Sequence, residues 1–136
     1  MSGETHLATL LRTLKPQLDP TDYVFGCLSE AAWPAVVALK PLGTFREDDG
    51  LTLILDQETA DRHGIRYQGL FRRITLTVHS SLEAVGLTAA VATKLTQAGI
   101  SANVVAAYYH DHIFVPQAAA TQALAALEAL SQTPLS

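Results

Sequence analysis

The chain has 136 residues, a formal net charge of −4 and 49% hydrophobic residues. A chain of this size buries roughly two-thirds of the surface that it exposes when unfolded, enough for one compact domain or two small ones that share a core. The acidic balance and the lack of a basic stripe argue against nucleic-acid binding. Because the sequence shows no secretory signal and no apolar run of about 18 residues, we expect a cytoplasmic protein that does not enter membranes.

The first part of the sequence predicts a helix and then a strand. Four leucines recur at helical spacing and mark the helix, namely Leu7, Leu10, Leu11 and Leu14. Pro16 ends this helix, and a strand is expected over residues 23–28. The single cysteine, Cys27, lies in this apolar run, so we expect it to be a small core residue. Residues 31–34 are expected to be irregular because Pro34 disfavours a helical conformation in the residue before it.

A hairpin and a short helix follow. Residues 41–46 and 51–55 are predicted to be strands joined by the polar turn Glu47-Asp48-Asp49-Gly50. Asp56 is expected to cap a helix that stops at Gly64. Each half lacks one strand of the full pattern, and residues 67–71 are a candidate strand by which one half completes the sheet of the other.

The second half of the sequence predicts the order strand, helix, strand, strand, helix. The expected bounds are 74–79, 85–98, 102–109, 113–115 and 118–130. The two adjacent strands would be joined at His110-Asp111-His112, which places Tyr108 and Tyr109 on opposite faces of one strand. With one more strand, this order becomes the ferredoxin-like pattern βαββαβ, in which two helices cover one face of an antiparallel sheet.

Two stretches carry a resemblance to a known family: GTFREDDGLTLIL, from Gly43 to Leu55, and ITLTVHSSLEAVGLTAAVATKLTQAGISANVVAAYYHDHIFVP, from Ile74 to Pro116. They resemble the small bacterial ACT-domain proteins that hold two ACT-like halves in one chain. The second stretch is similar to the ACT modules of aspartate kinases and of the CASTOR proteins. The resemblance implies an α+β protein with the ferredoxin-like ACT fold, a degenerate N-terminal half at 1–70, an ACT domain at 71–136, and an antiparallel sheet shared by the two halves.

ACT domains in general bind small ligands, mostly amino acids, at interfaces between ACT units. They use the loop between the first strand and the first helix, and the resemblance implies the same use here. In this chain the loop is His79-Ser80-Ser81-Leu82-Glu83-Ala84-Val85-Gly86. Common ACT sequences carry an Asp and a Pro-Gly pair in this loop, whereas here only Gly86 and the following Leu87 match.

The residue types in this loop suit a zwitterionic ligand. A helix that starts after Gly86 offers N–H groups and a partial positive charge to a carboxylate, and the nearby serine hydroxyls add donors. Acidic side chains of the loop or of the 47–49 turn can accept hydrogen bonds from an ammonium group. The candidate binding residues are Arg46, Glu47, Asp48, His79, Ser80, Ser81, Leu82, Glu83, Val85, Gly86, Leu87, Asn103 and Val104. In the alternative, Ser80 and Ser81 only cap the helix, and Arg46 forms a solvated ion pair with Glu47.

Together these observations predict a regulatory, non-catalytic module without a cofactor, which binds a small molecule, in the first instance an amino acid, and acts allosterically. Exposed sheet edges favour a homodimer, and the response would pass to a regulated protein partner or through the oligomer. Two alternatives remain open. One is a structural protein that dimerises through its sheets. The other is a metal-binding protein that uses His79, His110, Asp111 and His112, although this spacing is weak evidence and no metal site is expected.

Overall fold

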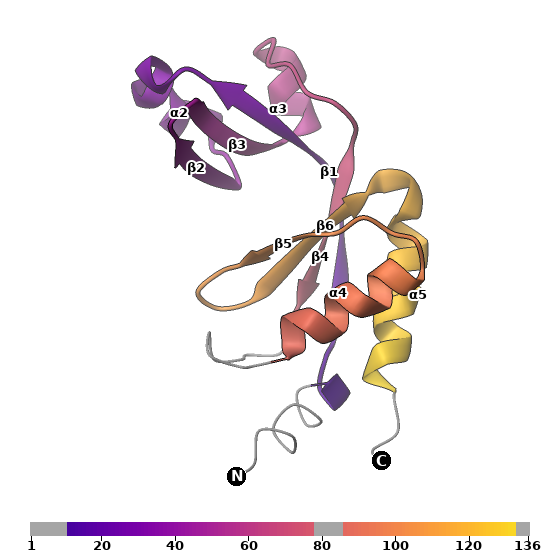
Figure 1. Cartoon of the computed structure of the whole chain (residues 1–136). Coiled ribbons are helices and arrows are strands. Elements are labelled where there is room, and N and C mark those ends of the chain that lie inside the picture. The colour runs from indigo at the N-terminus through magenta and orange to yellow at the C-terminus, as the bar shows by residue number, and fades with distance from the viewer. Residues whose placement is uncertain (1–10, 78–85, 133–136) are drawn as a thin grey trace. The chain divides into compact units, whose positions relative to one another are not determined.

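The computed structural model describes residues 11–77 and 86–132, whose helices and strands are labelled in Figure 1. The elements in chain order are β1 (Pro16–Leu28), η1 (Glu30–Ala32), α2 (Trp33–Leu39), β2 (Gly43–Glu47), β3 (Gly50–Asp56), α3 (Gln57–Arg62), β4 (Phe71–Leu76), α4 (Leu87–Gln97), β5 (Asn103–Ala106), β6 (Asp111–Pro116), η2 (Gln117–Ala119) and α5 (Ala120–Ser131). The strands form a sheet in the order β2-β3-β1-β4-β6-β5. The predicted α+β class and antiparallel sheet are confirmed.

The described residues form two compact units. The first, which we call the continuous unit, comprises Thr21–Phe71. The second, the split unit, combines the described residues up to Pro20 with those from Arg72 onward. Strand β1 therefore contributes its first residues to the split unit, where β4 is its neighbour in the sheet. The prediction that residues 67–71 supply the missing strand is wrong, because residues 65–70 are irregular and the start of β1 has this role instead.

In the split unit, α4 and α5 cover one face of the strands (Figure 1). The alternation predicted for β4 is confirmed, since Ile74 and Leu76 are buried against the helices. From α4 and α5 the core receives Leu87, Val91, Leu95, Ala123 and Leu127, and from β6 it receives Ile113 and Val115. Burying this apolar surface is the main stabilising contribution to the unit.

In the continuous unit, the predicted hairpin and helix cap are confirmed. Strand β3 alternates between buried leucines and outward residues, and it pairs antiparallel with both β2 and β1. The Asp56 carboxylate caps α3 by accepting hydrogen bonds from the backbone N–H and the hydroxyl of Thr59, both at 3.0 Å. Burial raises the pKa of Asp56, but these hydrogen bonds outweigh it, so the net pKa lies below its ordinary value.

Two local expectations for the continuous unit are wrong. Residues 33–39 form helix α2 rather than an irregular segment, because Pro34 lies in the first turn, where the missing N–H has no helical partner to lose. Cys27 is exposed rather than in the core. Strand β1 places Val24 toward the core, and the alternation of a strand puts Cys27 on the opposite face, beside Thr52.

The turn between β5 and β6 also differs from the prediction. The turn spans Ala107–His110 and is closed by the Ala107 N–H, which donates to the His110 carbonyl at 3.1 Å. Asp111 and His112 therefore belong to β6, and Tyr108 and Tyr109 lie in the turn with both rings exposed instead of on two faces of a strand. The register explains the difference, since Val104 must pair with Ile113 for both side chains to face the helices.

Candidate functional site

The predicted binding loop is only partly within the described residues. Outside them lie His79, Ser80, Ser81, Leu82, Glu83 and Val85. The described end of the loop is Gly86, followed by Leu87 as the first residue of α4. Gly86 has φ 96° and ψ −19°, and its carbonyl accepts a hydrogen bond from Ala90 N–H at 2.8 Å, which starts the helix.

The start of α4 has the features of an anion-binding helix terminus. Gly86 makes no side-chain cap, and the first turn of α4 contains no acidic residue. Leu87 is buried in the core and anchors this end of the helix. The first N–H groups of a helix have no partner within it, and a glycine at position 86 adds no side chain beside them, which are features that suit a small carboxylate.

Asn103 and Val104 lie on opposite faces of strand β5. Val104 pairs with Ile113 and packs against the core that also contains Leu87. Asn103 is exposed and pairs with Phe114, on the face away from the helices. Of these two predicted residues, the structure therefore brings only Val104 to the face that α4 covers.

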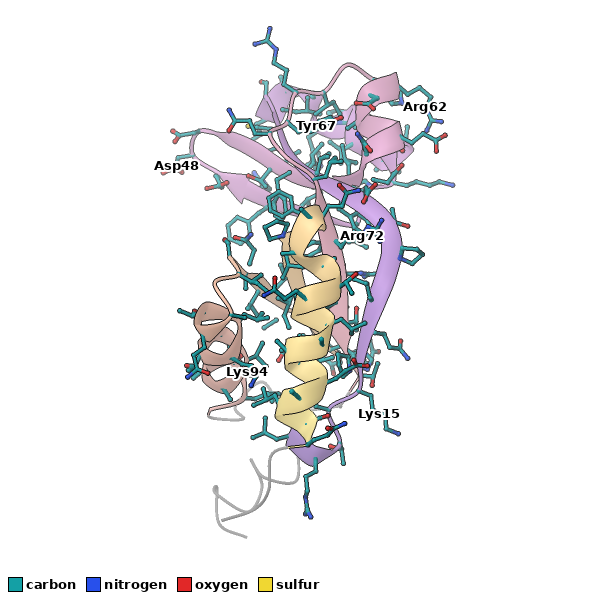
Figure 2. The ribbon with its side chains drawn as sticks, turned by 90° about the vertical axis from the view of Figure 1, so that its right-hand side faces the viewer. Lys15, Asp48, Arg62, Tyr67, Arg72 and Lys94 are labelled. Atoms are coloured by element: carbon teal, nitrogen blue, oxygen red, sulfur yellow. The ribbon has the colours of Figure 1, made fainter. Side chains whose placement is uncertain are left out.

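Arg46, Glu47 and Asp48 belong to the β2–β3 hairpin of the continuous unit, and Figure 2 shows Asp48 at the hairpin tip. The Arg46 guanidinium forms an ion pair with the Glu30 carboxylate at 2.6 Å, so the predicted pair with Glu47 is wrong. Neighbouring residues of a strand point to opposite faces, and Glu47 instead accepts a hydrogen bond from the Thr52 hydroxyl. Both members of the Arg46–Glu30 pair are exposed, so the pair adds little stability.

A row of polar side chains that we did not predict lies on the strand face of the split unit opposite to α4 and α5. Arg73 on β4 pairs with Asp19 on β1 at 2.9 Å, and these side chains are only 24% and 18% exposed. Thr75 and His112 are joined at 2.9 Å between Oγ1 and Nδ1. In the sequence, Arg73 and Thr75 alternate with the buried Ile74, so both polar residues lie on one face of β4. This alternation is the signal from which the row could have been predicted.

The pKa of His112 lies below its ordinary value of 6.5. Burial is the largest cause, followed by the positive charges of Arg73 and His110, and Asp111 opposes them. His112 is therefore held neutral near pH 7 and can exchange a hydrogen bond with Thr75. Within the described ranges no group of three or more His, Cys, Asp and Glu side chains is arranged to hold a metal ion.

A groove lies between α4 and α5 in the split unit. Its volume is about 390 Å³, and it is lined by Lys94, Gln97, Ala98, Gln122, Ala125, Ala126 and Ala129. Lys94, which is labelled on α4 in Figure 2, is one of these lining residues. The lining offers alanine methyl groups and few polar atoms, so it lacks the converging charges that a zwitterion requires. Among the described helices, none has the length and hydropathy of a membrane span.

Comparison with known families agrees with this architecture. Residues 2–72 match a family model described as ACT domain, and residues 72–129 match a second ACT-domain model. The chain therefore belongs to the ACT-domain family, which confirms the resemblance seen in the sequence. This membership places the protein with regulatory ligand-binding modules.

Several solved structures are similar to this chain. A Vibrio cholerae protein of unknown function, described as a possible transport protein, is 53% identical with a TM-score of 0.87, and the match covers 96% of this chain and 100% of that one. An Agrobacterium tumefaciens protein has 20% identity and a TM-score of 0.70 over 87% of this chain and 89% of its own. The ligand-free regulatory subunit of Thermus thermophilus aspartate kinase has 10% identity and a TM-score of 0.66 over 88% and 97%. No curated protein matches the sequence.

Proposed function

We propose that this protein is a sensor of a free amino acid, with residues 79–87 as the main binding loop. The support comes from family membership together with the described end of the loop, where Gly86 leads the main chain into α4 without a capping side chain. In this proposal the ACT-like halves are residues 1–70 and 71–136. The N-terminus of α4, with Ser80 and Ser81, binds the carboxylate.

The ammonium group needs an acceptor, and Glu83 of the loop offers one. Glu47 and Asp48 are exposed on the β2–β3 hairpin and remain predicted contacts. Val104, on the same face as Leu87, is the candidate apolar wall for a ligand side chain. Asn103 and Arg46 are exposed and remain predicted contacts.

The mechanism that we propose is allosteric. A ligand changes the protein only through its different affinities for two states, so ligand binding to the loop shifts an equilibrium that already exists. The response then passes to a homodimer partner or to a regulated protein. Location in the cytoplasm stays a prediction.

A thermal-shift panel of the twenty amino acids tests this function. A ligand present at about one hundred times its Kd stabilises the native state by about 2.7 kcal/mol, which raises Tm by several degrees. The matched controls are the methyl ester of the active amino acid, which lacks the carboxylate charge, and its decarboxylated amine. We expect a shift for one or a few amino acids and none for these controls. A flat response to all twenty would overturn the sensor and favour a structural protein.

A further inference from the structure

The polar row of the split unit continues to the last residues before the predicted binding loop. Three of its side chains lie along β4 and just beyond its end: Arg73, Thr75 and Thr77. They alternate with the buried Ile74 and Leu76, so they share the face opposite to α4 and α5. The predicted loop begins two positions after Thr77. The row therefore lies on the segment of chain from which the loop starts.

Each of these three side chains is bound to a neighbouring strand or its end. The Arg73 guanidinium pairs with β1, as described above. The Thr75 hydroxyl and the His112 ring on β6 are joined at 2.9 Å between Oγ1 and Nδ1. The Thr77 hydroxyl donates to the carbonyl of Lys15, the residue before β1, at 3.0 Å. Side-chain hydrogen bonds therefore hold the end of β4 to both of its neighbours.

The two ends of the loop are anchored in different ways. After the loop, Leu87 is buried in the core of the split unit. Before the loop, Leu76 is buried in the same core, and Thr75 and Thr77 hold the opposite face of the chain. A site made of main-chain groups binds well only when its supporting residues keep those groups in place. Loss of the Thr75 contact would therefore loosen the chain at one end of the loop.

We propose that Thr75 and His112 are positioning residues for the binding loop, and that protonation of His112 weakens ligand binding. The neutral ring keeps its hydrogen bond to the Thr75 hydroxyl and fixes the end of β4. The protonated ring carries a charge that must be hydrated, so it leaves its half-buried position and Thr75 loses its partner. This inference rests on the proposed function, which assigns residues 79–87 as the binding loop.

The charged groups around His112 favour its neutral form. Arg73 lies on the same face of β4, and His110 lies in the turn before β6; both oppose a positive charge on the ring, whereas the adjacent Asp111 favours one. Asp19 of β1 is bound to Arg73, and β5 carries no titratable group. Burial, followed by the two positive charges, lowers the pKa of His112 from its ordinary value of 6.5. The ring therefore gains its proton only in weakly acidic solution.

Amide hydrogen exchange tests this inference without a ligand. The proteins compared are wild type, Thr75→Val, His112→Gln and the matched control His63→Gln, which removes an exposed histidine of the continuous unit. From about pH 7.5 to about pH 5, wild type and His63→Gln should lose about tenfold or more of the protection at the amides of residues 75–77. This loss should share its midpoint with the NMR titration of the His112 ring, and it should exceed the loss at Leu95, which reports unfolding of the whole unit.

The two variants of the row should behave differently from each other. In His112→Gln the amide group can bond to Thr75 and carries no charge, so protection at residues 75–77 should stay the same at both pH values. In Thr75→Val the hydroxyl is absent, so protection should be low at both. Because His112→Gln keeps a hydrogen-bonding side chain, it decides the test even if Thr75→Val does not fold.

Calorimetry then measures whether the same proton controls ligand binding. The probe is the amino acid that gives the largest thermal shift among the twenty. Its Kd for wild type should rise about fivefold or more from about pH 7.5 to about pH 5, and its Kd for His112→Gln should stay constant. His79 of the loop is present in both proteins, so any effect of its titration is common to them.

The outcomes separate this inference from the proposed function. An amino acid that binds with equal Kd at both pH values, or with the same pH dependence in His112→Gln, would overturn control by His112 and leave the sensor standing. Equal protection of residues 75–77 at both pH values would overturn the positioning role. A flat response to all twenty amino acids would overturn the sensor, and hydrogen exchange then decides separately whether His112 controls the end of β4.

Discussion

Replacing Gly86 with alanine should destabilise the split unit. Gly86 has φ 96° and ψ −19°, which is beyond the left-handed region that non-glycine residues occasionally occupy. A Cβ atom in left-handed backbone approaches the following carbonyl oxygen, and we expect Gly86→Ala to lose about 1–2 kcal/mol of unfolding free energy. For a domain of about 60–100 residues, each kcal/mol lowers Tm by roughly 4–8 °C. Urea unfolding followed by circular dichroism measures the loss directly.

Gly99 supplies the matched control for this experiment. It lies just beyond the other end of α4 and has φ 74°, and apart from its chain neighbours no described residue has a heavy atom within 4 Å of the place where its Cβ would be. Gly99→Ala should therefore lose a similar stability through backbone strain alone, while the Kd of the active amino acid, measured by calorimetry, stays at the wild-type value. Gly86→Ala should also weaken that Kd at least tenfold, because the added methyl group blocks the approach to the main chain. Wild-type stability in Gly86→Ala would refute the strain argument, and equal loss of affinity in both variants would remove Gly86 from the site.

Three further predictions concern stability. A Cβ at Gly26 would lie 2.6 Å from Cγ2 of the buried Ile65, so Gly26→Ala should lose about 1–3 kcal/mol in urea unfolding, and no loss would mean that Ile65 moves freely. Arg73→Met removes the ion pair with Asp19 and should lower the free energy of unfolding by about 2 kcal/mol. Adding Asp19→Asn should restore part of this loss, and a double-mutant cycle without coupling would contradict the pair. The folded-state pKa of His112 is lowered by burial and by Arg73, so unfolded chains bind more protons and stability should fall as pH drops below about 6.5. His112→Gln should flatten this loss of stability below about pH 6.5, and an unchanged dependence of the unfolding free energy on pH in the variant would exclude His112 as its source.

The elements with strong local signals were predictable. The alternation of β4, the Asp56 cap and the hairpin from β2 to β3 all follow from short-range patterns, and each is confirmed. The ACT family was also evident from the sequence, because the order of elements in the second half and the motif around Gly86 agree. These features depend on neighbours within a few residues.

The errors arose where distant pairing decides the structure. The length of β1 was missed because its first residues, such as Pro16 and Asp19, have no strand pattern of their own and become a strand through contact with β4. The position of the β5–β6 turn depends on the Val104–Ile113 register, which the sequence of the turn does not encode. Cys27 was assigned to the core from its apolar neighbours, although alternation along β1 decides its face.

The polar row of the split unit illustrates the same limit for the site. Arg73 and Asp19 are 54 positions apart, so no local motif could join them. The position of Gly86 directly before α4 was predictable from its neighbours in the chain, and its part in a binding site stays a prediction. The prediction placed Asn103 and Val104 in the same site, but adjacent residues of a strand point to opposite faces of the sheet. The structure therefore places their side chains on opposite faces of β5.

The discontinuity of the split unit has a consequence for biosynthesis. As the nascent chain leaves the ribosome, Thr21–Phe71 emerge as one uninterrupted segment and can collapse at once. The first residues of β1 emerge earlier but can pair only after β4 has been synthesised. The paired residues of β1 and β4 lie more than fifty positions apart along the polypeptide. Contacts of such high sequence separation form slowly. We therefore expect cotranslational folding to be sequential, with the first residues of β1 docking onto β4 only after the continuous unit has formed.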